Sequence, residues 1–317
     1  MNEVKPAPGK GVYFIEVDSE YEGQRVDNFL LPRLKGVPKS RLYNLLRKGE
    51  LRVNKKRTKP DYKVRTGDLI RIPPIRVAER GEVGTAGDGL LRHLNANILF
   101  ENDGLLIVNK PSGLAVHGGS GVSLGLIEAL RQMRPEAKYL ELAHRLDKGT
   151  SGCIVVAKKR AILKELHASF RGTGMDKRYL ALAAGDWPRR RSTVSVSLRK
   201  TELKAGGCVV KVAADGKESC TRFEIVERLI GATLILAKPV TGRTHQIRVH
   251  AQYAGHPLIG DDKYGDPIAE KIMQSKGSRR LFLHAFKLKF RSAGELIEVE
   301  APLPPELNEL LAKIRKP

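Results

Sequence analysis

The sequence has few cysteines, few aromatic residues and no long apolar run, and each shortage excludes a class of protein. The three cysteines, Cys153, Cys208 and Cys220, lie in separate segments without paired spacing. They predict neither a disulfide framework nor a zinc site, which is typical of the reducing cytoplasm. Because no run reaches about 18 apolar residues, no transmembrane helix is predicted. The first residues lack the apolar segment of a secretory signal.

Acidic residues are also scarce. Lys and Arg total 57 against 35 Asp and Glu, which gives a net charge of +22. Such an excess concerns partners rather than fold, and it favours a polyphosphate partner such as nucleic acid. A membrane surface would instead require a basic amphipathic helix rich in Trp, Phe or Leu. The sequence shows no such pattern, so we expect no membrane partner.

The 317 residues are enough for two domains, and composition divides them into four segments. Residues 1–12 are rich in Lys, Pro and Gly, and we expect a disordered tail. Residues 18–78 are expected to form a small basic domain. Residues 79–95 are rich in Gly, Glu, Arg and Ala and are interpreted as a flexible linker. Residues 96–317 are expected to form a domain with a substantial core.

The positive charge is concentrated in the small domain. From Arg33 to Arg80 there are 16 Lys or Arg and 4 Asp or Glu, a net of +12 from 16 minus 4. Apolar residues still keep helical spacing over 26–34, and again from Pro38 to a stop at Gly49. Strand patterns follow, with a turn at Asn54 and a last strand at 69–72.

Two short helices, a basic turn and a few strands make residues 23–75 resemble the S4-type RNA-binding domain. The resemblance implies that the basic helix face and turn lie against RNA. The alternative is that these cations are only a solvated face, which suits a single lysine better than a whole basic surface. The cations implied to contact RNA are Arg25, Lys39, Arg41, Arg47, Lys55 and Lys56.

The larger domain combines strand patterns with irregularly placed helices. Residues 98–108 predict a β-hairpin around Asn102-Asp103-Gly104. Apolar residues at helical spacing predict helices near 126–133, 162–170 and 307–314. Strands dominate elsewhere, so the prediction is an α+β fold with a mixed, largely antiparallel sheet.

One string in this domain points to chemistry. In His144–Gly152 a carboxylate, Asp147, lies between Arg145 and Lys148, just before the apolar run 153–157. A carboxylate at the mouth of a buried strand, flanked by cations, is expected to stay ionised and to be reachable by a ligand. A surface ion pair that caps a turn is the alternative, and it is the usual explanation of an arbitrary Arg-x-Asp.

The whole string resembles the signature H-R-L-D-x-x-T-S-G of the RluA-type pseudouridine synthases, which favours the chemical interpretation. The resemblance implies that Asp147 is the essential catalytic residue. Gly149 departs from the acidic residue common in the family, but it lies in the turn. The resemblance also implies two lobes on one continuous sheet, with the active-site cleft between them.

Further strings extend the resemblance over most of residues 98–302. They are 109–113, 177–181, 241–250, 260–265 and 281–285. The resemblance implies that Tyr179 faces the target base and that Arg248 forms a salt bridge to Asp147. It also implies that Arg145 fills the space left by a flipped base and that Arg243 and His245 bind RNA. If 241–250 is a strand, alternation places Thr244, Gln246 and Arg248 on one face.

Other chemistries have less support. His245, His250 and His256 do not match a common zinc pattern, and no metal is expected. Ser151 lies outside a G-x-S-x-G motif, and Gly118-Gly119-Ser120-Gly121 lacks the Lys of a P-loop. A glycosidase would need a second carboxylate at a defined distance, and the sequence does not place Asp261 or Asp262 against Asp147.

The resemblance therefore implies isomerisation of uridine to pseudouridine in structured RNA, without a cofactor. Within the family, an attached S4 domain implies ribosomal RNA as the partner. The strings 37–40, 52–56, 72–80 and 115–121 resemble those of a family member that modifies 23S ribosomal RNA, and the nearest alternative is a paralogue with an S4 domain that acts elsewhere on 23S rRNA. We expect a cytoplasmic monomer. The first step stays open: Asp147 could attack C1′, take the C2′ proton or add to C6 of the base. A catalytically silent RNA-binding or ribosome-assembly protein is the alternative function.

Overall fold

The computed structural model describes residues 11–34, 36–75, 84–118, 124–190, 192–203 and 207–315. The chain is divided into two compact units, Met1–Glu82 and Val83–Pro317. Most of the predicted tail and residues 79–83 of the predicted linker lie outside the described residues. The linker interpretation is wrong for 88–95, because Asp88–Ala96 is helix α3 and its Leu94 is fully buried. None of the helices in the described ranges has the length and apolar character that a membrane crossing requires.

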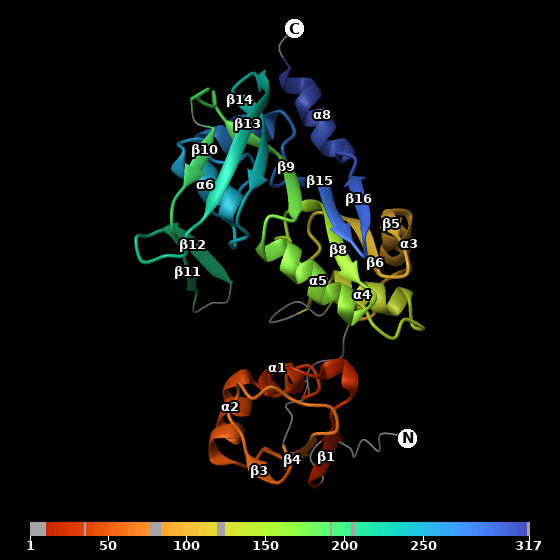
Figure 1. The fold of residues 1–317 in the computed structure, drawn as a ribbon. Coiled ribbons are helices and arrows are strands. Elements are labelled where there is room, and N and C mark those ends of the chain that lie inside the picture. Colours follow the sequence, from red (N-terminus) through yellow and green to blue (C-terminus); the bar gives the residue numbers. More distant parts are fainter. Residues whose placement is uncertain are drawn as a thin grey trace. The chain divides into compact units, whose positions relative to one another are not determined.

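The first unit is a four-stranded sheet in the order β1-β4-β2-β3, accompanied by two helices (Figure 1). Helix α2 buries Leu42, Leu45 and Leu46 and ends at Gly49, whose φ of 71° is left-handed, so the predicted helix is confirmed. Asn54 and Lys55 form the turn between β2 and β3. The elements are β1 (Tyr13–Glu16), α1 (Val26–Leu30), α2 (Lys39–Lys48), β2 (Arg52–Val53), β3 (Lys56–Arg57) and β4 (Leu69–Ile72).

The second unit contains a ten-stranded sheet, and its main path runs β10-β13-β14-β9-β15-β8-β6-β5 (Figure 1). Strand β16 pairs with β15, and β7 pairs with β8. Within the described ranges, β8 and β15 form the one parallel pair of this sheet, through Ser151–His284 and Gly152–Ala285. This confirms the predicted α+β class and the mixed, largely antiparallel sheet.

The strands of the second unit are β5 (Ile98–Glu101), β6 (Leu105–Lys110), β7 (Glu141–Leu142), β8 (Ser151–Ala157), β9 (Met175–Ala184), β10 (Thr193–Ser195), β11 (Leu198–Glu202), β12 (Cys208–Val212), β13 (Cys220–Leu229), β14 (Ala232–Pro239), β15 (Leu283–Ser292) and β16 (Glu295–Glu300). Its remaining helices are α4 (Leu126–Met133), α5 (Arg160–Arg171), α6 (Gln246–Tyr253), α7 (Pro267–Ser275) and α8 (Pro305–Ile314). The predicted hairpin, β5–β6, and the predicted helices α4, α5 and α8 are confirmed.

Strand β8 is buried along its whole length. Ile154 and Val156 pack in one apolar cluster with α4, and Cys153 and Val155 pack in another with Leu166 of α5. Because helices cover both faces, the strand is a continuous apolar run rather than an alternating one. This rigid strand fixes the loop before it, which carries Asp147.

Strands β11 and β12 form a separate two-stranded hairpin, which Figure 1 shows beside α6. Leu198 and Val210 of the hairpin pack with Val249 of α6 and with Tyr264 in a small buried cluster. The hairpin is thus attached to the same helix that carries Arg248.

Candidate active site

Ser151, at the end of the Asp147 loop, takes part in a chain of hydrogen bonds with His284 and Arg280. His284 donates from Nε2 to the Ala301 carbonyl, so its Nδ1 accepts the Ser151 hydroxyl at 2.9 Å. Arg280 in turn donates to the same Ser151 oxygen at 3.2 Å. Burial lowers the pKa of His284 to about 4, which keeps the ring neutral. Ser151 therefore anchors the start of β8, and this local role agrees with the absence of a hydrolase motif.

A second loop, residues 110–114, is bonded to the Asp147 loop. Lys110 donates to the carbonyls of Pro111, Leu114 and Lys148 at 2.9, 2.8 and 3.3 Å. Ser112 donates to the Gly149 carbonyl at 2.8 Å. Burial lowers the pKa of Lys110 to about 7, although the Asp147 carboxylate raises it. Sequence patterns assigned no role to Lys110 beyond its place in a family string.

Two glycines of the signature differ in what they require. Gly152 has a φ of 107°, and a side chain there would collide with the Ala285 backbone at the parallel β8–β15 contact. A side chain at Gly149 would instead meet Leu281 at 3.6 Å, an ordinary contact. The departure of Gly149 from the family pattern is therefore sterically neutral, whereas Gly152 is required by the fold.

Arg248 lies on a helix, so the strand interpretation of 241–250 is wrong. Gln246–Tyr253 is α6, and Arg248 faces the Asp147 loop from its first turns. Its Nη1 is 3.5 Å from Asp147 Oδ2, and this is the pairing that the resemblance implied. Its shorter bonds go elsewhere, to Asp261 at 2.8 and 2.6 Å and to Asp262 at 2.9 Å.

Asp261 is the buried partner that the sequence did not place. Its carboxylate also accepts the backbone N–H groups of Lys263 and Tyr264, both at 3.0 Å on Oδ1. Burial lowers the pKa of Arg248, but the Asp261 hydrogen bonds and the surrounding carboxylates outweigh this and raise it. Arg248 is thus a permanent cation held by Asp261, with Nη1 directed to Asp147.

His245 also lies against Asp147, although the resemblance implied RNA binding for it. Its Nε2 is 3.9 Å from Asp147 Oδ2, and its Nδ1 is 2.7 Å from the Tyr264 hydroxyl. Its side chain is 9% exposed, so little of it can contact RNA directly. Burial lowers the pKa of His245, although the Asp147 charge raises it.

Tyr179 lies on β9, the strand that pairs with β15, and packs between two apolar clusters. Burial raises the pKa of Tyr179, and the nearby charge of Asp147 adds to the effect. The predicted strand position of Tyr179 is correct, and the tyrosine remains protonated beside the carboxylate.

Asp147 thus lies among four different groups. Its side chain is 19% exposed and keeps access to solvent. Arg248 and His245 lie beside it on the α6 side. Its negative charge opposes the lowering of the Lys110 pKa by burial and adds to the raising of the Tyr179 pKa by burial. Arg145, two residues earlier, is exposed.

Three further histidines, His144, His250 and His256, have local partners. His250 is 2.8 Å from the Ser219 hydroxyl, and His256 is 2.9 Å from the Ala184 carbonyl. His144 accepts the Val155 N–H at 3.0 Å, and burial lowers its pKa to about 3. Among the described residues there is no group of three or more His, Cys, Asp or Glu that could hold a metal ion.

The six cations of the first unit that the resemblance implied to contact RNA fall into two groups. Arg25 is paired with the buried Asp27 at 2.7 Å, and Tyr43 donates to the same carboxylate. The main contact of the Arg25 side chain is therefore this ion pair within the domain. Within the described ranges, the other five have exposed side chains and no carboxylate within 4 Å; they are Lys39, Arg41, Arg47, Lys55 and Lys56. Arg243, in the second unit, is exposed and donates to the Glu218 carbonyl.

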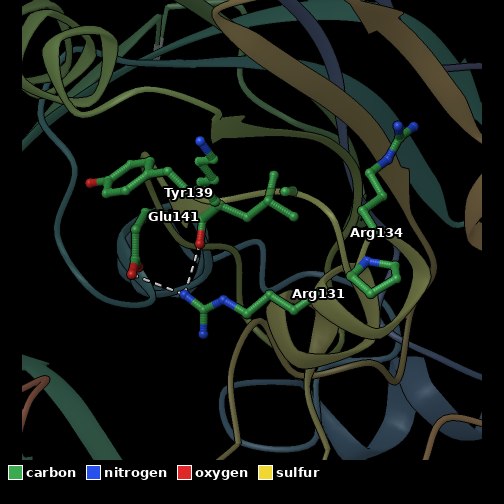
Figure 2. A pocket seen from close by; sticks show the side chains of 8 residues that line it. Arg131, Arg134, Tyr139 and Glu141 are labelled. Carbon is green, nitrogen blue, oxygen red and sulfur yellow. Dashed lines mark hydrogen bonds and ion pairs between the residues drawn. The ribbon is translucent and has the colours of Figure 1, made fainter. Parts of the chain in front are cut away.

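The described part of the second unit includes a larger and a smaller surface depression. A polar one of about 660 Å³ adjoins the Arg248 site and is lined by Asp261, Asp262, Lys263, Arg279 and Arg280, among others. A smaller one of about 280 Å³ lies at the end of α4 (Figure 2). There Arg131 donates to the Leu140 carbonyl and to Glu141, and none of the predicted site residues lines it.

Two family models match the chain. The RNA pseudouridylate synthase model matches residues 104–253, and the S4 domain model matches residues 24–70. The solved structure of human RNA pseudouridylate synthase domain containing 4 is 26% identical and has a TM-score of 0.59, covering 72% of this chain and 97% of that one.

Full-length relatives are more similar. The ribosomal large subunit pseudouridine synthase C of Haemophilus influenzae is 52% identical over 308 residues, 96% of both chains. That of Escherichia coli K12 is 52% identical over 309 residues, 96% of this chain and 97% of the relative. The chain therefore belongs to the RNA pseudouridylate synthase family, with an S4 domain before the synthase domain.

Proposed function

We propose that the protein isomerises uridine to pseudouridine in large-subunit ribosomal RNA, specifically 23S rRNA, with Asp147 as the catalytic residue. The relatives described above are named for the ribosomal large subunit, which supports the substrate. The observation that carries the residue assignment is the partly exposed Asp147 carboxylate facing Arg248 at 3.5 Å. We further propose that the enzyme acts as a cytoplasmic monomer without a cofactor.

The target base must leave its stack before it can reach Asp147. Extrusion costs a few kcal/mol, and basic contacts to the backbone offset part of it. Arg145 is exposed two residues before Asp147, which suits a side chain that fills the vacated space. The exposed cations of the S4 domain would provide the phosphate contacts.

Inside the site, Arg248 places a positive charge 3.5 Å from the Asp147 carboxylate, and the two opposite charges attract. The protonated Tyr179 ring offers an apolar face for the uracil. An ionised aspartate suits either nucleophilic attack or proton removal. Both routes break the bond between C1′ and N1 and rejoin the ribose through C5, after which C5 loses its hydrogen as a proton and N1 takes up a proton.

The test is pseudouridine mapping of 23S rRNA in cells that lack the protein, complemented with wild type or with Asp147→Asn. We expect specific sites to be lost and to return with wild type alone. Asn conserves shape, so the variant should still bind rRNA. Restoration by Asp147→Asn would contradict the catalytic assignment. No lost site at all would instead favour a silent RNA-binding or ribosome-assembly protein.

A further inference from the structure

His245 adopts a backbone conformation that its neighbours must hold in place. Its φ of 51° and ψ of 19° are left-handed, and the residue directly precedes α6. The other non-glycine residues with positive φ in the described ranges, Asn54, Lys55 and Ala293, lie in hairpin turns. Such a conformation costs about 1–3 kcal/mol and is commonly found where function requires a particular side-chain direction. Here it directs the ring between Asp147 and Tyr264.

The tautomer of His245 follows from the bonds of Tyr264. The Tyr264 oxygen accepts the Val210 backbone N–H at 2.9 Å. Tyr264 is 4% exposed, so its hydroxyl hydrogen needs an acceptor inside the protein. The acceptor that the geometry provides is His245 Nδ1, at 2.7 Å. Nδ1 is then unprotonated, and the ring hydrogen is on Nε2, the nitrogen that faces Asp147.

We propose that His245 positions the Asp147 carboxylate by donating its Nε2 hydrogen to it when substrate is bound, with Tyr264 and the β12 backbone fixing the tautomer. The present separation of 3.9 Å is longer than a hydrogen bond. Catalytic hydrogen bonds are often long without substrate and shorten in the reacting complex. His245 and Arg248 then hold the carboxylate from two directions. This role rests on the proposed function of Asp147.

The charges around His245 agree with a neutral donor. Burial is the largest effect and lowers the pKa of His245; Asp147 and Asp261 raise it, Arg248 and Lys263 lower it, and the net direction is downward. A neutral ring with its hydrogen on Nε2 can donate to Asp147 without neutralising it. The same neutral ring can accept from Tyr264, which a doubly protonated ring could not.

The series of hydrogen bonds that fixes His245 begins on the β11–β12 hairpin. Val210 is on β12, and Lys263, next to Tyr264, donates to the Cys208 carbonyl of the same strand at 3.1 Å. A displacement of the hairpin would therefore move Tyr264 and, through it, the ring of His245. The geometry couples the position of this hairpin to the carboxylate.

Two substitutions at residue 245 separate positioning from simple packing. In His245→Gln the amide nitrogen can occupy the place of Nε2, whereas in His245→Asn it can reach only the place of Nδ1. Asn is also the residue that tolerates a left-handed conformation best after Gly, so it should fold at least as well. We expect His245→Asn to lower the single-turnover rate roughly 10- to 100-fold, and His245→Gln to recover most of it. Equal losses in both variants would overturn the proposal.

A measurement on the protein without RNA tests the tautomer directly. In 15N-labelled full-length protein, the chemical shifts of the His245 ring should show a protonated Nε2 and an unprotonated Nδ1. Tyr264→Phe keeps the ring but removes the hydroxyl, and it should abolish this preference and lower the single-turnover rate. A protonated Nδ1 in the wild type would overturn the proposal. The shifts do not depend on activity, so failure of the Asp147 assignment would be seen separately, in the Asp147→Asn variant.

Discussion

The pair of Arg248 and Asp261 allows the sharpest stability prediction. In Asp261→Asn the amide must place its oxygen where Oδ1 now accepts N–H groups from Lys263, Tyr264 and Arg248. Its NH₂ group then replaces Oδ2, opposite the Arg248 Nε–H that now donates at 2.8 Å. Two donors would face each other, so the bond from Arg248 Nε to Asp261 would be lost together with the negative charge of Asp261.

The magnitude follows from burial. The Asp261 side chain is fully buried and that of Arg248 is 6% exposed. Removing one partner of a buried pair costs about 3–5 kcal/mol, because the remaining charge is left without compensation. Asp262 and Asp147 still face Arg248, so we expect the lower end, about 3 kcal/mol. Asp262→Asn is the matched control: its side chain is 79% exposed, and such a pair contributes only about 0–1 kcal/mol.

Urea unfolding followed by tryptophan fluorescence measures both variants. Trp187 is the single tryptophan of the chain, and it is buried in the apolar cluster that includes Ile247 and Ala251 of α6. Its emission therefore reports the unfolding of the unit that holds the pair. If Asp261→Asn lowers the free energy of unfolding no more than Asp262→Asn does, Arg248 does not depend on Asp261 in the way argued above.

Three further predictions follow from the same contacts. Because the pKa of Lys110 is lowered, the folded state binds fewer protons than the unfolded state between about pH 7 and pH 10, so this group makes the free energy of unfolding rise with pH there. Lys110→Met should flatten that rise in urea titrations. An equal rise in both proteins would contradict the prediction. Gly152→Ala should cost about 2 kcal/mol or more and Gly149→Ala less than about 1 kcal/mol, and equal thermal shifts would refute the steric argument. Replacing Lys39, Arg41 and Arg47 by Ala should reduce the slope of log binding constant against log salt by about 2 to 3, and an unchanged slope would remove these cations from the RNA contact.

Much of this architecture could be predicted because local patterns agree with the final contacts. The run 153–157 is apolar throughout and is a strand covered on both faces. Helix α2 buries Leu42, Leu45 and Leu46 on one face, and Gly49 caps its C-terminal end. The family signature located Asp147, and its pairing with Arg248 was expected before the structure.

The errors have physical causes. Residues 246–250 alternate polar and apolar side chains as a half-buried strand would, but they form a helix in which all five are buried. Polar and apolar residues therefore do not mark an exposed and a buried face, and the pattern does not distinguish a helix from a strand here. The glycines of 84–89 hid the helical spacing of Leu90, Leu91 and Leu94 in α3. The roles of Asp261 and Lys110 depend on contacts between distant segments, which no local pattern encodes.

The parallel contact of β8 with β15 has a consequence for how the protein is made. Ser151 and His284 are 133 residues apart in sequence, so joining them requires closing a long loop. The other two strands that pair with β8, which are β6 and β7, come earlier in the chain, whereas β15 begins only at Leu283 of 317 residues. The Ser151–His284 contact that holds the Asp147 loop is therefore completed by one of the last segments to be synthesised. The growing chain contains the whole string His144–Gly152 long before β15 is available to fix its position.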